Sequence, residues 1–164
     1  MKIEKRRRRQ GKTDYKARLS LLKSGKPRIV FRKTNKYIIG QYVKSKEAQD
    51  SVTIGVTSRD LLKFGWPKEM PGSLKSLPAS YLTGFLLGKK ILDKEDKASA
   101  VLDIGLLRSI KKSKVYAFSK GLVDAGIEIP CSKEVFPDEN RLVGRHMKKN
   151  PDAEKIKHEI EKIK

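Results

Sequence analysis

The sequence predicts an α/β fold: a mixed sheet sandwich with two main helices on a face, a basic N-terminal arm and a C-terminal helical extension. Three runs rich in β-branched and aromatic residues between positions 28 and 57 indicate strands. Two stretches with apolar residues at helical spacing follow, separated by an almost unbroken apolar run of strand length. We therefore expect an arm at residues 1–18, an α/β body at residues 19–132 and an extension at residues 133–164.

Positive charge is concentrated at the start of the chain. The 164 residues carry a formal net charge of +20. Residues 1–36 hold fifteen Lys or Arg against Glu4 and Asp14, a net charge of +13. A segment that repels itself this strongly needs a polyanion to fold against, and nucleic acid is the favoured partner. The alternative is a solvated, disordered tail.

Composition limits the remaining possibilities. With 37% hydrophobic and 35% charged residues, the chain has enough apolar material for one modest core. No stretch approaches the ~20 uncharged apolar residues that a membrane span needs, and no apolar run follows the N-terminal charges as in a secretory signal. Cys131 is the only cysteine, which fits a reducing compartment. We expect a cytoplasmic protein with no membrane partner.

The arm combines groups that bind phosphates with a ring that can stack on a base. Arg6–Arg9 supply four guanidinium forks, a geometry that suits phosphate oxygens. Lys12 and Thr13 add donors, and Tyr15 adds an aromatic ring at close spacing. At the end of the arm, Ala17–Lys23 predicts a short helix.

An antiparallel hairpin is predicted next. Its strands are Arg28–Arg32 and Tyr37–Val43, and they flank a polar turn, Lys33–Lys36, in which Asn35 tolerates positive φ. The strands are apolar, whereas the tip is basic. The body of the hairpin therefore belongs to the core, and its tip is expected to face a polyanion.

Short elements and loops follow the hairpin. Alternating apolar residues in Ser51–Thr57 predict a third strand. Ser58 can cap a helical turn, which Gly65 would end. Trp66 is expected to anchor its loop to the body rather than to serve as a binding platform.

The first main helix runs from about Ser76 to about Leu92. Its apolar residues recur at helical spacing along this stretch. Gly84 and Gly88 lie one turn apart within it, which predicts a close approach of this helix to a sheet.

A strand–helix–strand unit is predicted after the first main helix. The apolar run Ala100–Leu106 is typical of a strand in the middle of a covered sheet. The second main helix starts after Ser113 and stops at Gly126, and Ile127–Pro130 supplies a last short strand. A unit of this kind implies a right-handed crossover.

The C-terminal extension is predicted to be helical. Asp138–Met147 forms a short helix, and Asn150 caps a terminal helix with Pro151 in its first turn. The apolar stripe of the terminal helix consists of Ile156, Ile160 and Ile163. A helix with three apolar anchors is marginal alone, so we expect it to dock on its own body or on a neighbour.

The sequence shows no constellation typical of catalysis. His146 and His158 are the only histidines, and neither has metal-ligand spacing. Cys131 is expected to be a packing residue rather than a reactive thiol. Asp103 is expected to be a buried acid satisfied by a backbone donor or a neighbouring Lys, rather than a catalytic carboxylate. With no Gly-rich phosphate loop either, we expect no enzyme, no cofactor, no metal site and no small-molecule substrate.

Two functional classes remain open on the residues alone. One is a structural RNA-binding protein, and the other is a basic DNA-binding or chromatin protein or a non-ribosomal RNA-processing subunit. The chain lacks zinc-ligand spacing, leucine heptads and a convincing helix-turn-helix, which are signatures of duplex-DNA readers. An arm followed by a basic hairpin suits the irregular backbone and unstacked bases of folded RNA.

Two motifs carry a family resemblance. They are Arg6-Arg7-Arg8-Arg9-x-Gly11-Lys12-Thr13-Asp14-Tyr15-x-Ala17-Arg18 and Arg32-x-Thr34-Asn35-Lys36-Tyr37-Ile38. These segments resemble the archaeal and eukaryotic branch of the large-subunit ribosomal protein family that binds 5S ribosomal RNA (universal L-eighteen, with L-five as the eukaryotic member). The resemblance continues through residues 125–127 and 137–147, and matches less clearly after Asn150.

The resemblance implies a specific function. It implies a structural protein of the large ribosomal subunit that binds 5S rRNA, helps attach it to large-subunit rRNA, and contacts neighbouring large-subunit ribosomal proteins of the central protuberance. The family's RNA-binding segments match thirteen residues of this chain. In the arm these are Arg6, Arg7, Arg8, Arg9, Lys12, Thr13, Tyr15 and Arg18, and at the hairpin they are Arg32, Thr34, Asn35, Lys36 and Tyr37.

Overall fold

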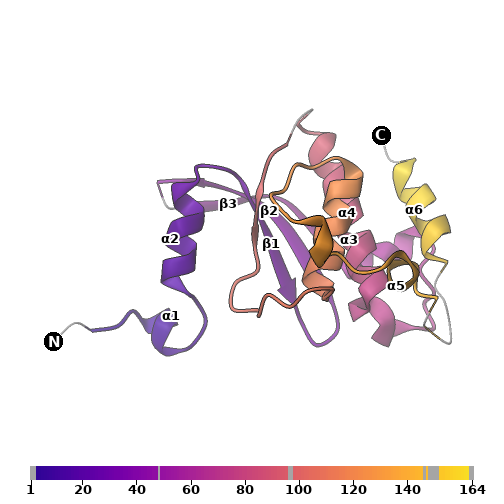
Figure 1. The fold of residues 1–164 in the computed structure, drawn as a ribbon, viewed down its shortest axis with the longest axis horizontal. Helices are drawn as coiled ribbons and strands as arrows, with labels where there is room; N and C mark the ends of the chain where they lie inside the picture. Colours follow the sequence, from indigo (N-terminus) through magenta and orange to yellow (C-terminus); the bar gives the residue numbers. More distant parts are fainter. Residues whose placement is uncertain (1–2, 48, 96–97, 146, 148–151, 163–164) are drawn as a thin grey trace.

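A computed structural model of the chain describes residues 3–47, 49–95, 98–145, 147 and 152–162. A four-stranded mixed sheet lies at its centre, in the order β3-β2-β1-β4 (Figure 1). The strands are β1 (Arg28–Lys33), β2 (Ile38–Lys46), β3 (Gln49–Thr57) and β4 (Val101–Asp103). Neighbours among the first three strands are antiparallel, and β4 pairs with β1 in parallel. The predicted mixed sheet and its hairpin are therefore confirmed.

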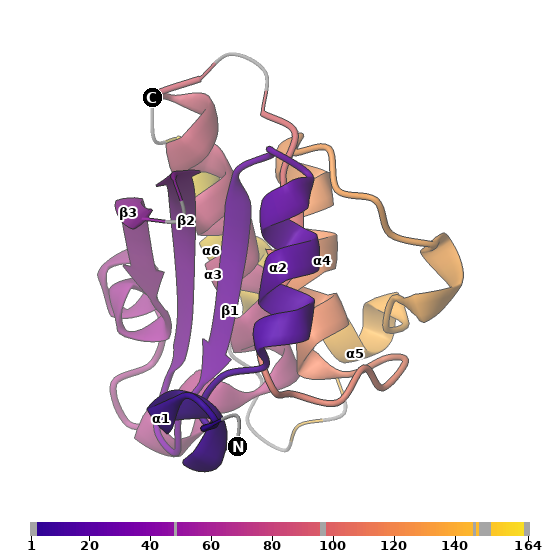
Figure 2. The same ribbon diagram turned by 90° about the vertical axis from the view of Figure 1, so that its left-hand side faces the viewer.

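The helices form layers on the two sides of this sheet. Helices α3 (Leu77–Leu92) and α4 (Lys114–Ala125) pack on one face, as the sequence predicted. Helix α2 (Tyr15–Lys23) lies on the opposite side, and Figure 2 shows it in front of the sheet. The core fills the space between the sheet and α3–α4, where Ile29 and Phe31 of β1 are fully buried.

Contact between α3 and α4 depends on glycines that admit the partner helix's backbone. A Cβ atom on Gly84 would lie 2.2 Å from the carbonyl oxygen of Phe118, and one on Gly121 would lie 2.1 Å from that of Tyr81. The expectation that Gly84 and Gly88 approach a sheet is wrong, because both face α4. The glycine that lets sheet and helices meet is Gly40 of β2, which packs against the Phe118 ring.

One predicted strand is shorter than expected, and another does not form. Only Val101–Asp103 of the run Ala100–Leu106 pairs, and it forms an edge strand rather than a central one. The Asp103 carboxylate accepts a hydrogen bond from the Gly105 N–H at 2.9 Å, and Gly105 has φ +62°, so the chain turns away from the sheet here. Ile127–Pro130 makes a single parallel bridge, between Glu128 and Ser99, and forms no strand. Its Pro130 lacks the N–H that a longer ladder needs.

Helix caps differ in detail from the prediction. Helix α2 starts two residues before the predicted helix, because the Asp14 side chain accepts hydrogen bonds from the N–H groups of Lys16 and Ala17. The helical turn after β3 is a 3-10 helix, η1 (Ser58–Phe64), and its cap is Thr57 rather than Ser58. The hydroxyl of Ser58 is buried and accepts a hydrogen bond from the backbone of β2 instead.

Several further predictions are confirmed. The Ser76 hydroxyl caps α3, and Gly126, with φ +108°, ends α4. Trp66 is 2% exposed and donates its indole N–H to the Ser73 hydroxyl, so it anchors its loop. The remaining 3-10 helices are η2 (Pro71–Lys75) and η3 (Lys133–Val135).

The extension closes over the far side of the helical layer (Figure 1). It contains α5 (Glu139–Val143), shorter than predicted and ended by Gly144, and α6 (Ala153–Glu161). Ile156 and Ile160 of α6 are buried, and α6 packs on α3 and η1, so the terminal helix docks on its own body. The predicted roles of Asn150, Pro151 and Ile163 fall outside the described residues. No helix in the described part of the chain is long and apolar enough to cross a membrane.

Candidate nucleic-acid interface

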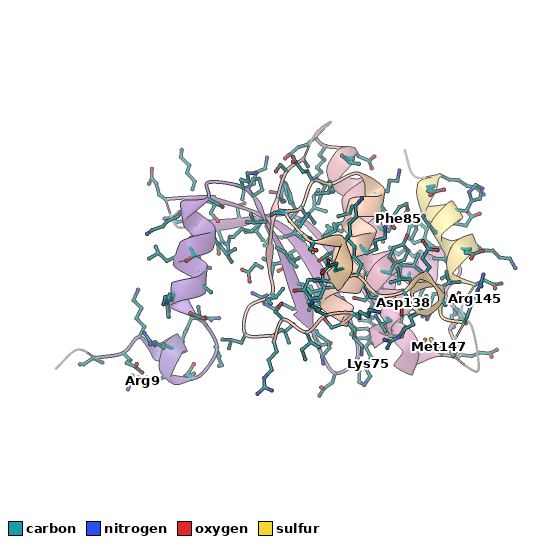
Figure 3. The ribbon with its side chains drawn as sticks, viewed as in Figure 1. Arg9, Lys75, Phe85, Asp138, Arg145 and Met147 are labelled. Carbon is teal, nitrogen blue, oxygen red and sulfur yellow. The ribbon has the colours of Figure 1, made fainter. Side chains whose placement is uncertain are left out.

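The arm contains a short helix that is not part of the core. Helix α1 (Arg6–Arg9) presents four exposed arginines, and Figure 3 shows Arg9 well away from the body. The Arg7 Nε donates a hydrogen bond of 2.9 Å to the Thr13 hydroxyl, which fixes the turn between α1 and α2. Arg8 lies 3.5 Å from the carboxylate of Glu4, an exposed and therefore weak ion pair. These guanidinium groups remain accessible to phosphates.

Tyr15 is the aromatic residue of the arm. Its ring is half-buried, and the Lys5 Nζ lies 4.6 Å from the ring centroid. This cation–π contact holds Lys5, a cation of the arm outside α1, beside the ring.

An ion network joins the arm to the sheet. The Arg18 guanidinium of α2 lies 2.8 Å from the Asp50 carboxylate of β3, and Arg28 of β1 lies 2.6 Å from that same carboxylate. Arg28 also lies 3.0 Å from Asp103 of β4, which in turn lies 3.2 Å from Arg32. We call these five residues the ion network. It connects four elements that are distant in sequence.

The centre of the ion network is buried. Arg28 is 2% exposed and Asp103 is 7% exposed. The Gly105 N–H and Arg32 satisfy the acceptors of Asp103, and the Ser45 hydroxyl accepts from Arg28, whereas the buried Arg28 Nε has no hydrogen-bond partner among the described residues. The predicted backbone donor to Asp103 is therefore confirmed, but its cationic partners are two arginines rather than a lysine.

The outer end of the ion network is held by Asp50. Burial acts to raise the pKa of its carboxyl group, but hydrogen bonds from Ser45, Arg18 and Arg28 outweigh burial and lower the pKa to about 2. Asp50 therefore stays ionised at neutral pH, in contact with Arg18 of helix α2.

Five of the predicted RNA-binding residues line one cleft. It has a volume of about 440 Å³ and lies between the arm and the turn after β4. The five residues are Arg7, Lys12, Thr13, Arg18 and Arg32. We call this the arm cleft. Arg32 was predicted with the hairpin tip, but its guanidinium points to Asp103 and so belongs to the arm cleft.

The hairpin tip is a second, more rigid group. The Thr34 hydroxyl accepts hydrogen bonds from the N–H of Tyr37, at 2.8 Å, and of Lys36, at 3.3 Å, and so closes the turn. Asn35 and Lys36 are exposed at its apex. The Tyr37 ring packs against the core, and the Arg59 guanidinium lies 4.9 Å from its centroid. The tip and α1 lie at the same end of the sheet in both views (Figures 1 and 2).

Sequence reasoning missed three residues that support the arm and the tip. Arg28 and Asp50 looked like an ordinary strand residue and a loop residue, although they connect the arm to the sheet. Arg59 stands between Ser58 and Asp60 with no basic neighbour, so no local pattern indicated its place beside Tyr37. Only the three-dimensional pairing of these residues identifies them.

Groups suited to other chemistry are not assembled in the described residues. They contain no cluster of three or more His, Cys, Asp or Glu that could hold a metal ion. Cys131 is half-buried against the core, and burial raises the pKa of its thiol, which fits the predicted packing role. His158 faces Glu161 on an exposed side of α6, and His146 lies outside the described residues.

Comparison with known proteins identifies the family. Residues 1–100 match the family described as ribosomal large subunit proteins 60S L5, and 50S L18. The chain is 48% identical over 158 residues to the large ribosomal subunit protein uL18 of Korarchaeum cryptofilum, covering 96% of this chain and 77% of that protein. It is 44% identical over 159 residues to the protein of the same name from Methanococcus maripaludis, covering 97% and 79%. The chain therefore belongs to the family of ribosomal large subunit proteins 60S L5 and 50S L18.

Proposed function

We propose that this ribosomal protein binds 5S rRNA through the arm cleft and the hairpin tip, and helps attach it to large-subunit rRNA beside other proteins of the central protuberance. The observation that carries the RNA-binding site is the convergence of Arg7, Lys12, Arg18 and Arg32 on one cleft. The identity of the RNA and of the neighbouring proteins comes from the family resemblance of the two motifs. The alternative of a non-ribosomal nucleic-acid-binding protein is set aside, because the chain belongs to a ribosomal family.

The geometry of the arm cleft supports phosphate binding. Asp50 orients Arg18, and Asp103 orients Arg32, whose guanidinium also donates to the carbonyl oxygens of Phe31 and Asp103. Arg7 and Lys12 approach from the arm side. Cations that are held in place before binding lose less side-chain entropy when they take up a phosphate.

Salt dependence tests this proposal. Each phosphate contact should contribute about 0.7 to 0.9 to the slope of log affinity against log salt concentration. Deleting residues 1–11 removes Arg7 and the rest of α1. We therefore expect weaker binding of 5S rRNA and a salt slope that falls by the amount that several phosphate contacts contribute. The deletion variant should unfold at the same urea concentration as the whole chain, because α1 has no buried residue. An unchanged slope would mean that the arm is a solvated tail.

We further propose that the tip discriminates between RNAs, whereas the arm mainly supplies affinity. The hydrogen bond of Arg7 to Thr13 and the ion pair of Arg8 with Glu4 are both exposed, so these long side chains can exchange them for phosphates in many arrangements. Asn35 and Tyr37 are held by the closed turn and by Arg59, which limits their poses. A fixed amide or ring that meets a base contributes about 1 to 3 kcal/mol of binding free energy.

A pair of double variants separates the two roles. Asn35→Ala with Tyr37→Ala should narrow the affinity gap between 5S rRNA and an unrelated structured RNA of equal length. Arg7→Ala with Arg8→Ala should weaken both complexes by similar factors. If the arginine pair narrows the affinity gap and the tip pair does not, the arm discriminates between RNAs and the two proposed roles are reversed.

A further inference from the structure

A second basic cleft lies on the α4 side of the molecule and shares Lys33 with the base of the hairpin tip. It has a volume of about 380 Å³ and is enclosed by the end of β1, the loop after β4, the start of α4 and the side of α5. The cations that line it are Lys33, Arg108, Lys112, Lys114 and Arg141, and no acidic residue lines it. We call it the α4 cleft. Three of these cations belong to the basic run 108–114, and Lys33 and Arg141 join them from β1 and α5.

Positive charge in the α4 cleft is poorly compensated. Lys112 is paired with Asp138 at 3.0 Å, but both side chains are largely exposed. Among the described residues, Lys33, Arg108, Lys114 and Arg141 have no ion pair. Burial lowers the pKa of Lys114, and the nearby charges of Lys33 and Lys75 lower it further. Figure 3 marks Lys75 and Asp138 on the helical side of the molecule, away from the arm.

Two further features lie at the α4 cleft. Ser113 lines the cleft and is the N-cap residue of α4, but its hydroxyl makes no capping hydrogen bond. The Ser113 Oγ is buried, and no partner for it lies among the described residues. Helix α4 has 12 residues, so its N-terminus adds a partial positive charge to the cluster. Cations, an unused hydroxyl and a helix N-terminus together form a site for an anion.

We propose that the α4 cleft is a second RNA-binding site, which takes the phosphates of a backbone segment other than the one bound in the arm cleft. Like charges that crowd together without acids destabilise the free protein, and a polyanion removes that cost. Lys33 directly precedes Thr34, so the cleft adjoins the hairpin tip and an RNA at the tip can continue into it. The inference rests on the proposed function, since the polyanion named is the RNA that this chain binds. An acidic protein segment is the competing occupant.

Paired neutral variants test the α4 cleft. Lys33→Gln with Lys114→Gln should lower the affinity of the whole chain for deproteinised large-subunit rRNA, including 5S rRNA, by about five- to eightfold per phosphate contact at 0.1 M salt. The salt slope should fall by about 0.7 to 0.9 per contact. The matched control is Lys90→Gln with Lys94→Gln at the C-terminal end of α3, which should leave the slope unchanged.

A second measurement does not depend on the folding of a variant. In the wild-type chain, RNA should protect Lys33 and Lys114 from amine acetylation and leave Lys94 reactive. The arm deletion is measured in parallel. If that deletion flattens the salt slope but Lys114 stays reactive and its variant binds normally, this inference is wrong and the proposed function stands. If polyglutamate protects Lys114 and RNA does not, the cleft is a protein site and the inference is also overturned.

Discussion

Helices α2 and α3 lie on opposite sides of one sheet and are held there by different forces. Twelve of the sixteen residues of α3 are buried, and glycines bring its backbone against α4. None of the nine residues of α2 is buried, and Leu19 is 56% exposed. Helix α2 is instead attached through the ion pair between Arg18 and Asp50, with the arm cleft beneath it.

We call the sheet with its α3–α4 layer the platform, because apolar packing fixes it. We call the arm with α2 and its ion pair the clamp, because the contacts that hold it can change. Apolar packing is insensitive to salt, whereas a half-exposed ion pair weakens as salt screens it. Phosphate groups can also compete with Asp50 for Arg18. Under the proposed function, the contacts that position the arm are the ones that an RNA can rearrange, while the α3–α4 layer keeps the hairpin tip in place.

The largest expected effect is at the buried centre of the ion network. Asp103→Ala leaves Arg28 buried with only Asp50 as an acidic partner, and it leaves Arg32 without its carboxylate. Breaking a buried pair from one side costs about 3 to 5 kcal/mol of unfolding free energy, which urea denaturation measures. Asp138→Ala breaks an exposed pair with Lys112 and should cost less than about 1 kcal/mol. Equal losses for the two variants would contradict the central role of Asp103.

The second effect tests the packing of the platform. A Cβ atom on Gly121 would lie 2.1 Å from the backbone oxygen of Tyr81 and 2.8 Å from the backbone nitrogen of Phe85. Neither group can move without shifting α3, so Gly121→Ala should lower the unfolding free energy by about 1 to 3 kcal/mol. Gly55→Ala in β3 is the control, because nothing lies within 4 Å of its Cβ position. Similar urea midpoints for the two variants would show that α3 and α4 can move apart without a loss of stability.

Local patterns in the sequence predicted most of the platform. Helical spacing located α3 and α4, and β-branched runs around a polar turn located the hairpin. The expectation that the chain is no enzyme is confirmed by its family. The run Ala100–Leu106 misled because an apolar run fits a central strand and a half-buried edge strand equally well. Asp103 was the signal inside it, since its side chain turns the backbone at Gly105.

The clamp was only partly predictable. The motif residues Arg6–Arg9, Lys12 and Arg18 were identified from the sequence, but the residues that position them were not. Asp50 and Asp103 act on the arm from 32 and 85 positions away from Arg18. Pairing of that kind is created by the fold, and no spacing rule within the chain reports it.

The smallest expected effect on global stability is at the outer end of the network. Asp50→Asn should cost less unfolding free energy than Asp103→Ala, because Asp50 is partly exposed, Arg28 keeps Asp103 as its buried acid, and the amide oxygen of Asn can still accept from Arg28. Hydrogen exchange should reveal a local effect instead: amides of α2 should exchange faster in the variant, whereas amides of α3 should not change. Added salt should act on α2 of the wild-type chain in the same direction.

Acid provides the matching test without a substitution. The pKa of Asp50 is about 2 in the folded chain, below its ordinary value of 3.8, so its contribution is fully present above about pH 5. That contribution is lost as the pH falls from about 5 toward 2, when the carboxylate takes up a proton and releases Arg18. The difference in α2 exchange between wild type and Asp50→Asn should therefore be constant from about pH 7 to about pH 5 and shrink below that. A difference that persists unchanged below pH 3 would mean that the charge of Asp50 does not hold the arm.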